Sequence, residues 1–206
     1  MEKRIIAVTD VHGKYLKLRF LLKKCKFDYK KDIFVFGGDL IDKGNMAWEI
    51  MDYFLFLEEK MKERFIWLQG NHEEMLVEDM EMGLDMDKTR QRIANIIKKH
   101  ELPLMYETDK CIFVHAGYEK GNDDRWMFLE DRSVISGQRQ YDGKLYLAGH
   151  SVVEYPLYIC NQERRKLLNG ELLPEKGAIF YDTGCCYGGK LTALIIDDNR
   201  IYIKQV

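Results

Sequence analysis

The chain has 206 residues, of which 46% are hydrophobic and 32% charged, and its formal net charge at pH 7 is −2. A chain of this length can bury roughly 70% of its unfolded surface, so it can fold without disulfides or a partner. The composition excludes a disordered chain, and the charge balance gives no overall basic surface for nucleic acid. No apolar run suits a membrane span or a signal peptide, which predicts a cytoplasmic protein without membrane contact.

Three short apolar runs in the first third of the chain predict buried strands over residues 4–8, 32–36 and 65–68. Each run ends in a group of Gly, Asp, His or Asn residues, which predicts a loop. Apolar residues at helical spacing predict helices over about 14–25 and around 48–55. This alternation is typical of a βαβαβ unit with a largely parallel sheet, and ligands bind such sheets at the carboxyl ends of the strands.

Residues 73–100 have a different pattern, dominated by charge. Seven acidic and no basic residues fall within 73–87, whereas five basic and no acidic residues fall within 88–99. Gly83 and the acidic residues after it predict a turn between two helices of opposite charge. The favoured interpretation is a self-complementary helical hairpin that packs on the body of the protein. The alternative is a lid that shapes substrate entry to an active site.

After Pro103, short apolar runs separated by Gly, Asn and Asp turns predict a second set of strands, more antiparallel than the first. These runs are residues 111–114, 145–148, 178–181, 191–196 and 201–203. The chain contains no repeat, linker or low-complexity segment. One α/β domain over residues 1–206 is therefore predicted, with 73–100 as a helical insertion.

Five short segments follow apolar runs and contain four of the five histidines in the chain. They are Asp10-Val11-His12-Gly13, Gly38-Asp39-Leu40-Ile41-Asp42, Gly70-Asn71-His72-Glu73, Val114-His115-Ala116-Gly117 and Gly149-His150-Ser151. A single histidine is more often structural than a ligand. The recurrence of such groups after successive strands instead predicts a dinuclear metal site.

The residue types also indicate which metals would bind. Imidazole nitrogen, carboxylate oxygen and amide oxygen together suit Mn, Fe or Zn. Two cations about 3.5–4 Å apart need an anionic bridge and further ligands on each side. The predicted ligands are Asp39 as the bridge, Asp10 and His12 on the first metal, and Asn71, His115 and His150 on the second. With a bridging water the site stays positively charged, which suits an anionic phosphate ester.

Hydrolysis of a phosphate ester also needs a proton donor for the leaving group. His72 follows the predicted ligand Asn71 directly, so it lies near the metals without being needed as a ligand. Asp42, three residues after Asp39, can accept a hydrogen bond from one imidazole nitrogen and raise the pKa of His72. These two residues are the predicted general acid and its orienting carboxylate.

Together these segments resemble the calcineurin-like metallophosphoesterases, within them the phosphoprotein phosphatase branch and its bacterial and phage serine/threonine phosphatases. That branch has DxHG, GDxVDRG, GNHE, a later His-Gly or His-Ala segment and GH[T/S]. This chain has DVHG, GDLIDKG, GNHEEM, VHAG and GHS in the same order. The resemblance implies a four-layer α/β/β/α sandwich with two metals at the sheet edges. Mn²⁺ is the first choice for them, and Fe and Zn are alternatives.

The resemblance also implies phosphate-binding residues, one of which departs from the pattern. The branch has an arginine where this chain has Lys43, which is a mobile point charge instead of a planar fork. A second phosphate-binding arginine is implied between the VHAG and GHS segments, where Arg125, Arg132 and Arg139 lie. We predict Arg132 for this role and expect Asn71 to contact the phosphate as well.

The leading hypothesis is a metal-dependent enzyme that hydrolyses phosphoserine and phosphothreonine in proteins. The same branch contains symmetrical diadenosine tetraphosphate hydrolases, which are one alternative, and a broad small-molecule phosphatase is another. A non-catalytic scaffold that binds metal or phosphate is disfavoured because His72, Asp42 and every predicted ligand are present. The expected partners are a phosphorylated protein or peptide, or a nucleotide, and no nucleic acid.

Overall fold

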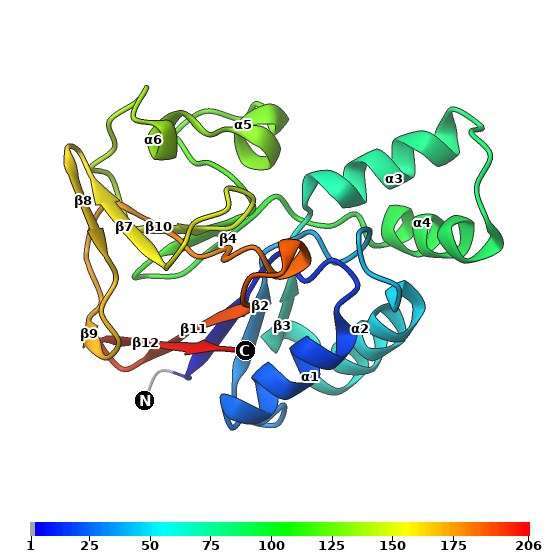
Figure 1. Cartoon of the computed structure of the whole chain (residues 1–206), viewed down its shortest axis with the longest axis horizontal. Coiled ribbons are helices and arrows are strands. Elements are labelled where there is room, and N and C mark those ends of the chain that lie inside the picture. The colour runs from blue at the N-terminus through cyan, green and yellow to red at the C-terminus, as the bar shows by residue number, and fades with distance from the viewer. Residues whose placement is uncertain (1–2) are drawn as a thin grey trace.

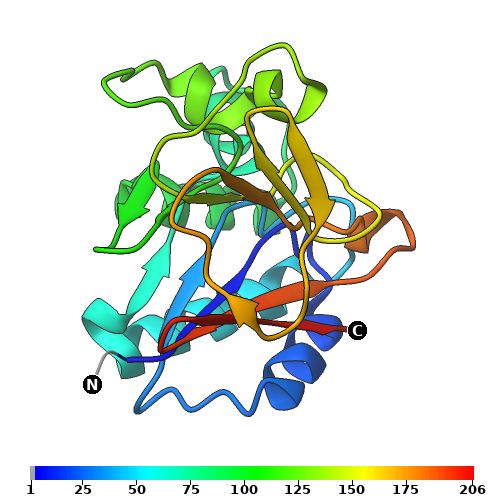
Figure 2. The same ribbon diagram turned by 90° about the vertical axis from the view of Figure 1, so that its left-hand side faces the viewer.

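The computed structural model describes residues 3–206 and arranges them as two six-stranded sheets between two layers of helices (Figures 1 and 2). In Figure 2 the layers follow one another from α1 (Tyr15–Lys24) at the bottom, through both sheets, to α5 (Arg125–Glu130) and α6 (Ser133–Ser136) at the top. The predicted α/β/β/α sandwich is confirmed. Within residues 3–206, no helix is both long and apolar enough to cross a bilayer. The predicted compartment stays a prediction.

The first sheet has the strand order β3-β2-β1-β11-β12-β9. Its strands are β1 (Ile5–Val8), β2 (Ile33–Phe36), β3 (Phe65–Trp67), β9 (Glu171–Leu172), β11 (Thr192–Asp197) and β12 (Arg200–Gln205). β1, β2 and β3 are parallel, as the sequence predicts. They are connected by α1 and by α2 (Ala47–Met61), which leads through the short helix η1 (Lys62–Arg64) into β3.

Side chains of the parallel strands alternate between two cores, because successive residues of a strand point to opposite faces. Ile6 and Phe34 pack against the apolar faces of α1 and α2 in one core. Their neighbours Ile5 and Val35 face the second sheet in the other core. Both faces of these strands are thus buried, which is why the runs are apolar throughout.

The second sheet has the strand order β4-β5-β6-β10-β7-β8. Its strands are β4 (Met105–Glu107), β5 (Ile112–Val114), β6 (Tyr146–Ala148), β7 (Leu157–Cys160), β8 (Glu163–Lys166) and β10 (Ala178–Phe180). Phe128 of α5 and Val134 of α6 cover its outer face. The short helix η2 (Cys185–Tyr187) follows β10 and returns the chain to the first sheet.

The last two strands differ from the sequence prediction, which placed 191–196 and 201–203 in the second set. β11 instead pairs antiparallel with β1, and β12 pairs with β11. This arrangement covers the edge of β1 that would otherwise expose unpaired backbone groups. The apolar run predicts that a strand forms, but its partner depends on which sheet has a free edge where the chain arrives.

Residues 71–100 form the predicted helical hairpin from α3 (Asn71–Glu81) and α4 (Lys88–His100) (Figure 1). The opposite charges pair, since Nζ of Lys98 lies 2.9 Å from a carboxylate oxygen of Glu81. Ile93 and Ile97 of α4 are buried in the core that α1 and α2 share. The hairpin therefore packs on the body, as the favoured interpretation predicts.

Candidate metal centre

Five loops converge where the strands β1, β2, β3, β5 and β6 end. Backbone hydrogen bonds join them, from Asp10 N to the Gly38 carbonyl (3.0 Å) and from Gly149 N to the His115 carbonyl (2.8 Å). The loops surround a cavity of about 350 Å³. It is lined by Asp10, His12, Asp39, Lys43, Asn71, His72, Arg132, His150, Val152, Asp182 and Tyr187. His115, a further predicted ligand, is fully buried and contacts the lining residue Asn71.

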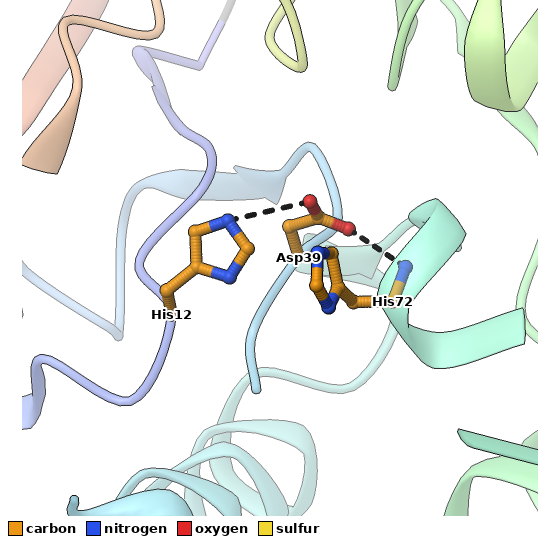
Figure 3. A group of neighbouring side chains, drawn as sticks. All are labelled: His12, Asp39 and His72. Carbon is orange, nitrogen blue, oxygen red and sulfur yellow. Dashed lines mark hydrogen bonds and ion pairs between the residues drawn. The ribbon is translucent and has the colours of Figure 1, made fainter. Parts of the chain in front are cut away.

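His12 and Asp39 define one side of this cavity (Figure 3). Nδ1 of His12 lies 2.8 Å from the Ile41 carbonyl, which can only accept, so Nδ1 carries the proton of the neutral ring. Nε2 is then left with a free electron pair and lies 3.4 Å from Oδ2 of Asp39. A metal-ligating histidine is commonly oriented in this way through its second nitrogen.

His115 lies beside the other oxygen of the Asp39 carboxylate and contacts Asn71. Nδ1 of His115 lies 2.8 Å from the Gly37 carbonyl, and Nε2 lies 3.5 Å from Oδ1 of Asp39 and 3.0 Å from Oδ1 of Asn71. The two carboxylate oxygens of Asp39 therefore face imidazole nitrogens on different sides. Among residues 3–206, possible ligand atoms within 4.8 Å of one another form two groups, and Asp39 belongs to both: His12-Asp39-His72 and Asp10-Asp39-His115.

His150 and Arg132 complete the cavity from the second sheet. The His150 backbone N–H donates to Oδ2 of Asp10 (3.0 Å), which connects loops of the two sheets. Arg132 donates from Nε to Nε2 of His150 (3.1 Å). The other two candidate arginines are engaged elsewhere, Arg125 with Glu74 and Arg139 with Asp131. The structure thus places Arg132 in the cavity, and its phosphate-binding role stays a prediction.

The electrostatics of these side chains fit a pair of divalent cations. Burial lowers the pKa of His12 to about 4 and that of His150 to about 3, so both rings are neutral at pH 7 and can donate an electron pair. Burial also raises the pKa of Asp10 well above its ordinary value, and the carboxylates of Asp182 and Asp39 raise it further. Several carboxylates thus share one buried cavity with neutral imidazoles, and a cation would relieve their repulsion.

His72 and Asp42 form the predicted pair at the edge of the cavity. Nδ1 of His72 lies 2.7 Å from Oδ2 of Asp42. Burial lowers the pKa of His72, but the hydrogen bond to Asp42 and the charge of Asp39 outweigh this, and the pKa is raised overall. The His72 ring contacts that of His12 edge-on at 4.8 Å. His72 also belongs to a possible ligand group, so its role as the acid stays a prediction.

The loops that carry these residues have an unusual backbone. Positive φ values, which residues other than glycine rarely adopt, occur at Asp10, His12, Asp39, Asp42 and His150. Such conformations persist only when the surroundings hold them, and they cluster at functional sites. Lys43 also has positive φ, so six of the residues predicted to form this site sit in backbone that the fold holds under strain.

Glu73 supplies part of this support, a role that the sequence analysis did not give it. The buried carboxylate accepts hydrogen bonds from the backbone N–H groups of Asp39 (2.8 Å), Leu40 (2.8 Å) and Gly70 (2.9 Å). Burial and the neighbouring Asp39 raise the pKa of Glu73 to about 7. Gly70 must be glycine, because a Cβ there would lie 2.3 Å from Oδ1 of Asp39.

Asp182 and Tyr187 also line the cavity, although neither was among the predicted site residues. Asp182 follows the strand β10 and precedes Gly184, a pattern like that of the other site loops, and this signal could have found it. Burial raises its pKa to about 6. Tyr187 had no such signal. It lies beside Lys43, whose Nζ is 5.1 Å from the tyrosine ring and 3.3 Å from Nε2 of His12.

Comparison with known proteins agrees with this geometry. The model of the calcineurin-like phosphoesterase family matches residues 3–199. A Buchnera aphidicola (subsp. Schizaphis graminum) protein named symmetrical bis(5'-nucleosyl)-tetraphosphatase is 33% identical over 98% of this chain and 97% of its own. Serine/threonine-protein phosphatase 2 of Escherichia coli is 27% identical over 88% and 79%. The crystal structure of a Sphaerobacter thermophilus metallophosphoesterase has a TM-score of 0.67 at 18% identity, covering 98% and 88%. The chain therefore belongs to the calcineurin-like phosphoesterase family and is a hydrolase.

Proposed function

We propose that this chain hydrolyses phosphoserine and phosphothreonine monoesters with two divalent cations, Mn²⁺ first among them. The predicted ligands for these cations are Asp10, His12, Asp39, Asn71, His115 and His150. The observation that carries the proposal is Asp39, whose two oxygens face His12 and His115 on different sides. This is the arrangement that a carboxylate bridging two metals requires.

The chemistry divides between the cations and the side chains of the chain. Divalent cations held by the predicted ligands would supply a water of lowered pKa and would polarise the phosphoryl oxygen. Lys43 and Arg132 bring positive charge to the cavity, and with the Asn71 amide they are proposed to bind and orient the phosphate. These contacts favour the charge that develops on the phosphoryl oxygens in the transition state.

His72 is proposed to give a proton to the leaving alkoxide. The Asp42 carboxylate can only accept from Nδ1 of His72, so Nδ1 keeps its proton and Nε2 is the nitrogen that can donate. Asp42 also favours the protonated ring, which supports an acid form near neutral pH. The residue needs no contact with a metal for this role.

A second candidate function is symmetrical hydrolysis of diadenosine tetraphosphate. It is supported by the Buchnera relative, which carries that name and matches nearly the whole chain. The Escherichia coli relative, which carries the name of a protein phosphatase, supports the first candidate. One substrate presents a phosphomonoester and the other a phosphoanhydride, but both present a phosphoryl group to the same cavity, so substrate choice rests on surfaces around it.

The test is a side-by-side assay of metal-stripped protein with added Mn²⁺. The substrates are a phosphothreonine peptide, diadenosine tetraphosphate and p-nitrophenyl phosphate. A higher kcat/KM on the peptide supports the protein phosphatase. A higher value on the dinucleotide replaces it with the second candidate, and activity on p-nitrophenyl phosphate alone favours a broad small-molecule phosphatase. Activity on none, with two metals bound, supports the non-catalytic scaffold.

A further inference from the structure

Asp42 makes a second contact that the proposed chemistry does not use. Its Oδ2 accepts from His72 at 2.7 Å, and its Oδ1 accepts from Nη1 of Arg90. Arg90 lies in α4, 48 residues farther along the chain. One carboxylate is thus held from both sides, by the imidazole on one oxygen and by a guanidinium on the other.

This second contact matters because Asp42 stands on a loop without regular secondary structure. Asp42 and Lys43 have φ values of 67° and 57°, and the turn closes with Gly44 N donating to the Asp42 carbonyl at 2.6 Å. The backbone of Asp42 is therefore held by no helix or strand, and among residues 3–206 its carboxylate is restrained only by its side-chain contacts with His72 and Arg90. A charge-assisted hydrogen bond from an arginine adds both energy and direction, so Arg90 restricts the rotation of the Asp42 carboxylate.

The position of Arg90 is itself well determined. Asp87 caps α4 by accepting from the backbone N–H groups of Thr89 (2.8 Å) and Arg90 (2.9 Å). Two residues onward, Arg92 stacks on the ring of Trp48 in α2 at 3.9 Å. Nη2 of Arg90 lies 4.0 Å from Asp79 of α3. The guanidinium therefore reaches Asp42 from a helix anchored to both neighbouring helices.

We propose that Arg90 is a positioning residue for the His72–Asp42 pair. It holds the Asp42 carboxylate in the orientation that keeps the His72 ring in place to donate a proton. This inference rests on the proposed function, in which His72 is the acid. The helical hairpin thereby supplies a side chain to the active site as well as packing on the body.

The experiment compares Arg90→Gln with the matched control Arg92→Gln, which removes the same charge from the same helix but leaves Asp42 untouched. Each Mn²⁺-loaded variant is assayed on phenyl phosphate, whose leaving group needs a proton, and on p-nitrophenyl phosphate, whose leaving group does not. We expect Arg90→Gln to lower kcat on phenyl phosphate about 10-fold, less than the roughly 100-fold or more that general acid catalysis contributes, because His72 itself remains. KM, and kcat on p-nitrophenyl phosphate, should change less than about 2-fold. Arg92→Gln removes the contact with Trp48 but keeps the Asp87 cap and the buried face of α4, so it should change these values much less than Arg90→Gln does.

Two further variants separate positioning from a general structural effect. Arg90→Lys keeps a cation and should recover part of the lost kcat. In an Asp42→Asn background, Arg90→Gln should have no additional effect, because residues that act as one unit are not additive. An equal loss on both substrates, or an equal loss from Arg92→Gln, would overturn the inference.

The outcomes also separate this inference from the proposed function. If His72→Asn lowers kcat selectively on phenyl phosphate and Arg90→Gln does not, His72 remains the acid and only the role of Arg90 is refuted. If His72→Asn shows no dependence on the leaving group, the acid role in the proposed function fails, and the inference fails with it.

Discussion

Asp39 is the residue on which the metal centre depends most directly. It is almost fully buried, its two oxygens face two imidazoles, and its backbone N–H is held by Glu73. Its φ of 60° also makes it part of the strained loop after β2. Both the contacts with the two imidazoles and the negative charge between them depend on this one carboxylate. Replacing Asp39 is therefore the most direct test of the site.

The first prediction is that Asp39→Asn binds metal weakly and loses turnover. Asparagine keeps the shape of the side chain but removes the charge that would bridge two cations. Activity should fall by more than the roughly 10–100-fold that loss of an outer-shell partner costs. Mn²⁺ content after desalting and turnover of p-nitrophenyl phosphate measure the two effects. Full activity with both metals bound would contradict the bridging role.

The second prediction concerns His72, whose Nδ1 is taken by Asp42. His72→Asn should keep its Mn²⁺, because the six predicted ligands remain. Its kcat should fall by about 100-fold or more on phenyl phosphate and much less on p-nitrophenyl phosphate, since only the poorer leaving group needs a proton. Loss of Mn²⁺ from the variant would instead identify His72 as a ligand, which its place beside His12 and Asp39 also permits.

At the scale of elements, α4 stabilises the helical hairpin and also positions Arg90 beside Asp42. Its N-cap is Asp87, and its buried face includes Ile93 and Ile97. Because Arg90 lies in the first turn, the cap that starts the helix also determines where this guanidinium lies. A change to the cap should therefore affect local stability first and the site second.

The third prediction is that Asp87→Ala lowers the free energy of unfolding by about 1 kcal/mol, the usual cost of losing a cap. For a chain of this size that corresponds to a fall in Tm of about 2–4 °C. Calorimetry measures the global effect, and hydrogen exchange should show faster exchange in α4. Asp85→Ala, an exposed position in the preceding turn, is the control. Equal shifts for both variants would argue against the cap.

The elements themselves were largely predictable. The first three strands and the helices between them were predicted because each has its own periodicity and a polar loop after it. The turn at residues 197–199 predicts that β11 and β12 form a hairpin, but the pairing of β11 with β1 was not predictable, because an apolar run of six residues fits either sheet. The short helices α5 and α6 give too few turns for a helical period to be recognised.

At the scale of the whole molecule, the cavity brings acidic groups from both sheets into one buried space. Burial raises the pKa of Asp182 from its ordinary 3.8 to about 6. Between about pH 4 and 6 the folded protein thus keeps a proton that the unfolded chain has released. The contribution of Asp182 to stability therefore falls as pH rises through this window, and a bound cation would offset that loss.

The fourth prediction is that Mn²⁺ raises Tm more at about pH 7.5 than at about pH 5. At the lower pH the protons on Asp182 and Asp10 compete with the cation, whereas His12 and His150 are already neutral there. A ligand stabilises the folded state more when it binds more tightly. The rise in Tm caused by Mn²⁺ should therefore become larger as these acids ionise. Thermal melts with and without excess Mn²⁺ measure it. An increment that is equal or larger at pH 5 would contradict this account.

By itself, the sequence determined the strand-and-helix order of the first half, the residue types of the metal centre and the family that they resemble. Periodicity and residue type are properties of short windows, so they can be recognised without knowing the path of the chain. Only the tertiary structure decided that β11 covers the edge of β1, that Asp182 enters the cavity and that Arg90 reaches Asp42. These contacts join residues far apart in the chain, and they exist only because packing of the helices and sheets brings those residues together.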